Sequence, residues 1–254
     1  MVDGSGSMDM GKGRIVLLAI AALVQVGCSK VHRPDTMRFA TAADYPPFGY
    51  VERGEIVGFE IDLARQVARE LGKEAIFQDL SFAAVLPALG SGRVDTAVAT
   101  ITATDERSKT YDFSNPYFHE ELFSIFPIRR PLTTIPSLAG KRLACQLGST
   151  MELWLRSHEN AAHIVAMDSV GQIMEAVKAG QVDGAILDGF QAKEICSRGD
   201  GLGCSFLARS SSGYAMAFRK NSPLRPRVNE ILRSMEADGT LGELRQRWGL
   251  DGRP

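Results

Sequence analysis

Apolar residues along the chain recur at two spacings, one typical of amphipathic helices and the other of buried strands. Short apolar runs at residues 37–42 and 75–80 predict strands. Between them, residues 60–71 predict a helix that ends at Gly72. Its buried face would be formed by Ile61, Ala64, Val67, Ala68 and Leu71. The N-terminal part of the fold therefore begins as strand, helix, strand.

The same alternation of strands and helices then occurs a second time. Further strands are predicted at 96–99, 142–146, 164–167, 184–187 and 213–220, and further helices at 81–90, 150–157, 170–179, 225–238 and 240–248. Two pieces, Gly92–Ala99 and Gly180–Leu187, share the pattern Gly-x-Val-Asp-x-Ala-Val/Ile. Alternating strands and helices imply parallel sheets with helical crossovers. Two such sets predict an α/β protein with two lobes.

Composition and charge argue against nucleic acid and metal ions as partners of this chain. The 254 residues are 44% hydrophobic and 23% charged, with a net charge of -1, which is ordinary for a globular protein. The chain has no basic stripe and no Cys/His finger pattern, which argues against a nucleic-acid partner. The histidines at 32, 119, 158 and 163 show no metal-ligand spacing with the cysteines. We therefore predict neither a metal nor a cofactor.

The N-terminal residues 1–28 have the pattern of a signal for export. Lys12 and Arg14 precede an apolar run, residues 15–26, that is too short for an ordinary membrane span. Gly27-Cys28 follows at once and resembles a lipoprotein cleavage site, although Gln25 stands where such sites usually have Leu. An ordinary exported protein is the alternative, and translation beginning at Met8 or Met10 is also open. Residues 29–36 would then be a tether, and the localisation extracytoplasmic.

Export permits disulfide bonds. Cys196 and Cys204 flank a turn-rich loop that can bring their Cα atoms into bridging range, so we predict a disulfide between them. Cys145 lies in an apolar run and is expected to be a buried free thiol.

The segment from Thr100 to Phe118 carries the clearest chemical signal. It follows an apolar run and presents hydroxyls at Thr100 and Thr102 together with the guanidinium of Arg107. Arginine pairs with a carboxylate through two parallel hydrogen bonds, and neighbouring hydroxyls can bind the other polar groups of a small zwitterion. The segment resembles the signature of family 3 periplasmic solute-binding proteins, the amino-acid receptors of ABC importers. Six motifs of that family occur in order: residues 44–48, 58–63, 102–117, 140–150, 183–188 and 239–248.

The resemblance implies a type II periplasmic binding protein fold, with a ligand cleft between two lobes. Lobe 1 would comprise residues 37–125 and 219–254, and lobe 2 residues 126–218. The two hinge crossings would lie near 123–128 and 215–219.

The resemblance also implies roles for the polar site residues. Arg107 would bind the ligand α-carboxylate, Thr102 would bind the carboxylate or amino group, and Thr100 would add a backbone acceptor. Asp188 would pair with the α-ammonium, or serve only as a helix N-cap. Gly148, Ser149 and Thr150 would offer N–H groups to the carboxylate, or form a plain capping loop.

Side-chain selection is expected from a second group of residues. Tyr45 and Phe82 match positions that often form an aromatic wall, although either could equally be core. Ala42 stands where many relatives have an acid, Gln146 stands where some have Lys, and Met151 follows the Thr150 loop. Unless Asp44 turns inward, the pocket has no carboxylate for a basic side chain. These residues favour an uncharged amino acid.

The leading interpretation is a non-catalytic, monomeric receptor that delivers its amino acid to an ABC transporter permease. A cyclohexadienyl dehydratase-like enzyme on the same fold is the main alternative, with Asp188, Asp44 or Glu120 as acid or base. A sensor or murein-hydrolase module is a second alternative, and no kinase or hydrolase segment follows within the given sequence.

Overall fold

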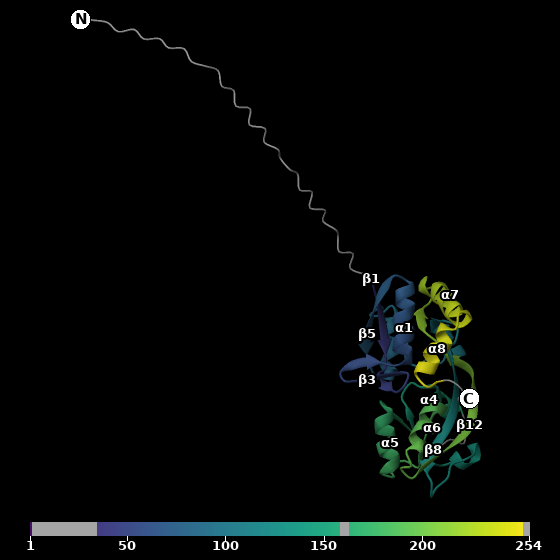
Figure 1. Ribbon diagram of the computed structural model, residues 1–254. Helices are drawn as coiled ribbons and strands as arrows, with labels where there is room; N and C mark the ends of the chain where they lie inside the picture. The colour runs from purple at the N-terminus through teal and green to yellow at the C-terminus, as the bar shows by residue number, and fades with distance from the viewer. Residues whose placement is uncertain (2–34, 158–162, 251–254) are drawn as a thin grey trace. The chain divides into compact units, whose positions relative to one another are not determined.

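Two five-stranded sheets form the framework of the chain (Figure 1). The computed structural model describes residues 35–157 and 163–250, which all belong to one compact unit. The predicted signal peptide, Cys28 and the tether up to residue 34 lie outside the described residues. Within the described part of the chain, no helix is both long and apolar enough to cross a membrane.

The first sheet has the strand order β5-β1-β6-β13-β7. Strand β1 pairs in parallel with β5 and β6, whereas β13 pairs antiparallel with β6 and β7. The strands are β1 (Asp35–Thr41), β5 (Lys73–Asp79), β6 (Thr96–Ala97), β7 (Tyr111–Phe113) and β13 (Ala217–Arg219). Its helices are α1 (Phe59–Glu70), α2 (Phe82–Gly90), α3 (Asp105–Thr110), α7 (Leu224–Ala237) and α8 (Thr240–Arg247). The C-terminal helices α7 and α8 pack against α1, so the chain returns to this sheet after leaving it.

Helix α1 confirms the prediction made from its apolar face. Its residues Ile61, Ala64, Val67 and Ala68 are fully buried, and Gly72 follows in the left-handed conformation with φ 71°. At the other end, Gly58 has φ 136°, and a Cβ there would lie 2.2 Å from the carbonyl oxygen of Phe48. Glycine is therefore required where α1 packs on a small sheet of β2 (Asp44–Tyr45), β3 (Gly49–Glu52) and β4 (Glu55–Val57).

The second sheet has the strand order β10-β9-β11-β8-β12. Its strands are β8 (Phe118–Pro127), β9 (Arg142–Gln146), β10 (His163–Met167), β11 (Gly184–Asp188) and β12 (Leu202–Tyr214). A 3₁₀ turn, η1 (Ile135–Leu138), precedes helices α4 (Thr150–Ser157), α5 (Val170–Lys178) and α6 (Gly189–Ser197). In the sequence, all of these elements lie between β7 and β13, which both belong to the first sheet.

The position of β8 differs from the predicted hinge at 123–128. The strand pairs with β11 on one side and β12 on the other, and Ile125 is fully buried. Since this apolar run is a central strand, the lobe limit predicted at residues 125 and 126 would cut through the second sheet. The chain instead passes between the sheets at residues 114–117 and 215–216. These two segments run side by side, with hydrogen bonds from Ser114 N to Met216 O and from Tyr117 N to Tyr214 O, both 2.9 Å.

Candidate functional site

A small cavity lies where loops of the first sheet meet β11, α4 and α6 of the second sheet. Its volume is about 20 Å³, close to the space one water molecule needs. Nine predicted site residues line it: Tyr45, Phe82, Thr100, Arg107, Gln146, Ser149, Thr150, Met151 and Asp188. The predicted residues Thr102, Gly148 and Asp44 lie beside the cavity rather than in its lining.

Arg107 lies on α3, whose N-terminus is capped by the Thr104 hydroxyl accepting from the Arg107 N–H at 3.2 Å. Its guanidinium donates to the carbonyl oxygen of Thr102 at 3.0 Å and to that of Gly148 at 2.8 Å. The guanidinium carbon also lies 5.8 Å from the centre of the Phe82 ring. Arg107 is therefore held on the first-sheet side of the cavity while it reaches the loop before α4.

Thr100 is positioned by a buried carboxylate that the sequence analysis did not identify. Its N–H donates to both carboxylate oxygens of Glu60, at 2.8 and 2.9 Å, and its φ is 48°, in the left-handed region. The hydroxyl of Tyr117 donates to the same carboxylate. Glu60 is only 1% exposed, and burial raises the pKa of its carboxyl to about 7. The carboxylate thus ties α1 to the cavity wall and to one of the two crossing segments.

Asp188 ends β11 and caps α6, which is one of the two roles considered for this residue; its pairing with a ligand ammonium stays a prediction. Its Oδ1 accepts from the N–H groups of Phe190 at 2.9 Å and Gln191 at 3.1 Å. Tyr45, from the first-sheet side, donates its hydroxyl to the same oxygen. Burial raises the pKa of the Asp188 carboxyl to about 6, although these hydrogen bonds oppose the shift. The Asp188 carboxyl thus accepts hydrogen bonds from two backbone N–H groups and from the Tyr45 hydroxyl.

The Gly148–Ser149 part of the loop before α4 already forms hydrogen bonds within the protein, which leaves fewer of its groups for a ligand than predicted. The Gly148 N–H donates to Glu152 at 2.7 Å, and the Gly148 carbonyl accepts from Arg107. The Ser149 hydroxyl accepts from the Glu152 N–H at 3.2 Å, which is an ordinary helix-capping contact. Ser149 and Thr150 remain the members of this loop that line the cavity.

The aromatic residues act both as core and as cavity wall. Tyr45 is buried with its ring 5.0 Å from that of Phe48, yet it also lines the cavity. Burial, followed by the nearby Asp188 charge, raises the pKa of Tyr45 well above its ordinary value. Phe82 is half-buried under Arg107.

Asp44 faces the other side of the cleft. The side-chain amide of Gln146 donates to its Oδ2 at 3.2 Å, which joins the small sheet to β9. Removal from water raises the pKa of the Asp44 carboxyl. Asp44 does not line the small cavity, although its hydrogen bond to Gln146 places it beside that cavity, so the prediction of an uncharged ligand stays a prediction.

Three cavity residues were missed by the sequence analysis: Leu187, Gln191 and Tyr214. Gln191 lies three residues after Asp188, so the start of α6 places both side chains at one end of the helix. That spacing could have identified it. Tyr214 ends β12 and forms an isolated bridge with Thr102, which no local pattern indicates.

Cys145, Cys196 and Cys204, the cysteines in the described part of the chain, are free thiols in the structure. Cys196 and Cys204 nevertheless lie within hydrogen-bonding reach, and burial raises the pKa of Cys196 to about 12. Cys145 is buried as expected. Among the described residues, no group of three or more His, Cys, Asp or Glu side chains is placed to hold a metal ion.

Comparisons with known proteins agree with this geometry. Residues 37–251 match the family model of bacterial extracellular solute-binding proteins, family 3. The L-cystine-binding protein TcyJ of Escherichia coli (strain K12) is 30% identical over 225 residues, covering 87% of this chain and 85% of that protein. The arginine-binding extracellular protein ArtP of Bacillus subtilis (strain 168) is 32% identical, covering 82% and 84%. The solved structure of an ancestral arginine-binding protein bound to glutamine is 32% identical, with a TM-score of 0.80, covering 87% and 100%.

Proposed function

Because the chain belongs to the bacterial extracellular solute-binding proteins of family 3, we propose that it binds a free amino acid and delivers it to an ABC transporter permease. The observation that carries this proposal is that Arg107 and Asp188 line the same cavity. A guanidinium on one side and a carboxylate on the other match the carboxylate and ammonium of a zwitterion. Relatives named for binding cystine and arginine support an amino acid as the ligand.

The ligand would replace contacts that the protein now makes with itself. Its carboxylate would take the Arg107 donor that bonds the Gly148 carbonyl, together with the Ser149 and Thr150 loop. Its ammonium would bond Asp188, whose pKa would fall again beside a positive charge. Thr102 and Thr100 would contribute their backbone and hydroxyl groups.

We divide the protein into two lobes that close on this ligand. Lobe 1 comprises the first sheet and its helices, and lobe 2 comprises residues 118–214 with the second sheet. The paired segments at 114–117 and 215–216 would serve as the hinge. Closure is favoured because only the closed arrangement offers the ligand both Arg107 and Asp188.

Several finer features are part of the proposal. Cys28 would carry a lipid anchor, and Cys28→Ser should then move the protein from the membrane fraction to the soluble one.

Cys196 and Cys204 would form a disulfide bond after export, which intact-mass measurement with and without reductant would reveal. The receptor would act as a monomer.

A dehydratase-like enzyme is not favoured, since the relatives reported above are all named as binding proteins. The class of ligand side chain stays a prediction: Ala42 and Gln146 favour an uncharged one, whereas the position of Asp44 supplies a carboxylate near the cleft.

A thermal-shift screen of residues 29–254 against the common amino acids, prephenate and arogenate tests the proposal. A ligand that binds only the folded state raises the melting temperature. Arg107→Ala should weaken binding by about 2–5 kcal/mol, because a charged, desolvated contact is lost. The matched control is Arg227→Ala on exposed α7, which should bind normally. A shift with prephenate alone, followed by turnover, would overturn the receptor function.

A further inference from the structure

Glu60, at the start of α1, does not line the small cavity, yet its buried carboxylate is bonded to two segments that matter for binding. Its two oxygens accept the Thr100 N–H at 2.8 and 2.9 Å, and one of them also accepts the Tyr117 hydroxyl. Thr100 lines the cavity, whereas Tyr117 lies on the crossing segment 114–117, part of the proposed hinge. The side chain therefore joins the cavity wall to the hinge.

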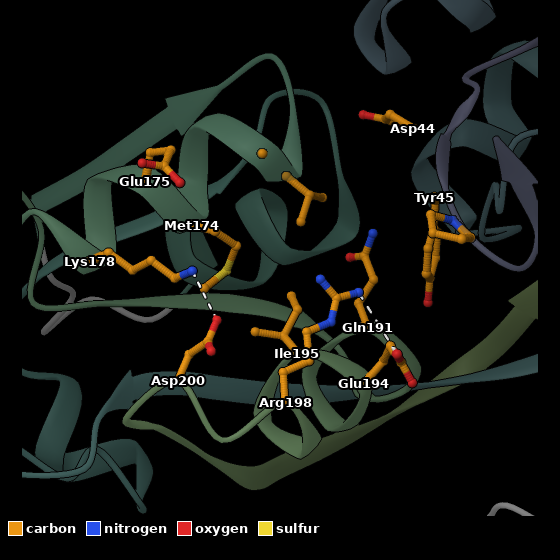
Figure 2. A pocket seen from close by; sticks show the side chains of 13 residues that line it. Asp44, Tyr45, Met174, Glu175, Lys178, Gln191, Glu194, Ile195, Arg198 and Asp200 are labelled. Carbon is orange, nitrogen blue, oxygen red and sulfur yellow. Dashed lines mark hydrogen bonds and ion pairs between the residues drawn. The ribbon is translucent and has the colours of Figure 1, made fainter. Parts of the chain in front are cut away.

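The backbone of Glu60 attaches a third segment. Its N–H donates to the Phe48 carbonyl oxygen at 2.9 Å, which fixes the end of the 44–48 segment against α1. The same segment carries Tyr45, whose side chain extends toward α6, where Gln191 lies (Figure 2). Tyr45 and Gln191 both line the small cavity. One residue outside the cavity thus holds two parts of its wall as well as the hinge.

Thr100 has a backbone conformation that needs this support. Its φ of 48° lies in the left-handed region, which is unfavourable for a β-branched residue. Its hydroxyl donates to the Ala99 carbonyl oxygen at 2.8 Å, and its N–H is held by Glu60. These bonds fix the orientation of the Thr100 peptide in the cavity wall. Strain of this kind persists only where surrounding contacts maintain it, and it is concentrated at functional sites.

The charge state of Glu60 decides whether all of these bonds can form together. An ionised carboxylate presents acceptors at both oxygens, whereas a protonated acid or an amide presents a donor group at one of the two positions. That donor would face the Thr100 N–H, which approaches both oxygens within 2.9 Å. Burial raises the pKa of the Glu60 carboxyl to about 7, so the residue changes its charge state near neutral pH.

The charged groups around this network come from the crossing segment, from α8 and from α1 itself. Arg245 of α8 donates to the Tyr117 carbonyl oxygen at 3.1 Å, and Asp62 of α1 pairs with Arg65 at 3.4 Å. Further partners are Glu236 for Arg245, and Arg247 and Trp248 for Asp62. Within the described part of the chain, no cation contributes to the raised pKa of Glu60, which is due to burial and is opposed by its two hydrogen-bond donors.

We propose that Glu60 is a positioning residue for amino-acid binding: its ionised carboxylate holds Thr100 and Tyr117 in the arrangement that the bound amino acid requires. This inference rests on the proposed function, because the amino acid itself binds between Arg107 and Asp188. Glu60 does not touch the amino acid and acts through the residues it holds. Binding and ionisation of Glu60 favour each other, so the amino-acid-bound protein loses this proton at a lower pH than the free protein.

Isothermal titration of the common amino acids and cystine into the unmodified protein and into Glu60→Gln tests the proposal at pH 5.5 and pH 8. At pH 8, each amino acid that binds should bind Glu60→Gln about tenfold more weakly, because the amide lacks the second acceptor oxygen. At pH 5.5, where Glu60 is protonated, the two proteins should bind alike. Asp188 titrates in both proteins, so the ratio of their affinities isolates Glu60. The matched control, Glu230→Gln, removes an exposed carboxylate on α7 and should bind normally at both pH values.

Tyr117→Phe supplies a readout that a merely structural role would not move. Loss of the hydroxyl removes one donor from the Glu60 carboxylate, so the pKa of Glu60 should rise further. The pH at which amino-acid affinity falls should therefore move up by about one unit. The same substitution made in Glu60→Gln should leave the pH profile of binding unchanged, and an equal shift in both backgrounds would overturn the proposal.

Urea unfolding at pH 8 separates positioning from a loss of folding. Glu60→Gln should be at least as stable as the unmodified protein, so weaker binding by a less stable variant would contradict a positioning role. An affinity ratio that is the same at pH 5.5 and pH 8 would also contradict it. If Arg107→Ala abolishes binding while Glu60→Gln binds normally, the positioning role falls and the receptor function stands. If no amino acid binds to the unmodified protein, both conclusions fall.

Discussion

Replacement of Glu60 by Gln should make the protein more stable at neutral pH, although the carboxylate accepts three hydrogen bonds. Burial holds the pKa of Glu60 at about 7 instead of 4.5, in spite of the donors Thr100 N–H and Tyr117 O–H. No cation is among the causes of this shift. The carboxylate therefore has no cation to offset the cost of ionising a buried group, and its hydrogen bonds offset only part of that cost.

The magnitude follows from the two pKa values. The folded protein keeps the Glu60 proton up to about pH 7, whereas the unfolded chain releases it near 4.5. The folded state thus binds more protons in this window, and the free energy of unfolding falls as the pH rises through it. Each pH unit corresponds to about 1.4 kcal/mol. Between pH 5 and 7.5 the loss assigned to Glu60 is roughly 2–3 kcal/mol, and Gln, which does not titrate, avoids it.

Urea unfolding at pH 5 and pH 7.5 measures the effect. The two proteins should differ little at pH 5, where Gln resembles the protonated acid, and Glu60→Gln should gain roughly 2–3 kcal/mol by pH 7.5. Asp188 gives the unmodified protein a slope of the same sign at lower pH, and this part remains in the variant. Glu230→Gln is the control and should keep the full slope. Equal pH dependence in Glu60→Gln and the unmodified protein would refute the reasoning.

Three further predictions concern binding and packing. Amino-acid affinity should fall about tenfold per pH unit below about 6, because Asp188 must lose a proton to pair with the ligand ammonium; a dissociation constant that stays flat between pH 5 and 7 in calorimetry contradicts this. Gly58→Ala should cost about 3 kcal/mol or more in urea unfolding, since its Cβ would strike backbone, whereas Gly54→Ala, with open space around it, should cost only about 1. Ile125→Ala in β8 should cost about 2–5 kcal/mol, whereas Ile128→Ala, 61% exposed, should cost under about 0.5; equal losses would exclude β8 as a central strand.

The sequence was sufficient for the elements and for most of the residues that line the small cavity. Asp188 could be placed because an apolar strand ends at it, and Arg107 because its flanking motif is specific. Glu60 could not be identified, since its burial depends on Thr100, which lies 40 residues away in the chain. Nothing local in the helix start at residue 59 distinguishes a buried carboxylate from a solvated one.

The assignment of β8 failed for a related reason. The apolar residues of β8 (Phe118–Pro127) indicate that the strand is buried, but not in which sheet it is buried. The direction of Asp44 was equally undetermined, because its contact with Gln146 spans residues from two different sheets. Pairings between distant segments are properties of the assembled protein and leave no periodic signal.

The position of β13 in the first sheet determines which of the two sheets can be completed first during synthesis. This strand lies between β6 and β7, although it follows β7 by about a hundred residues in the chain. The second sheet, by contrast, is built from one uninterrupted stretch. Because the chain is synthesised from its N-terminus, all strands of the second sheet are available before β13, the inner strand of the first sheet, has been made. The first sheet therefore stays incomplete until almost the whole polypeptide has been made, because its inner strand is among the last segments to be synthesised.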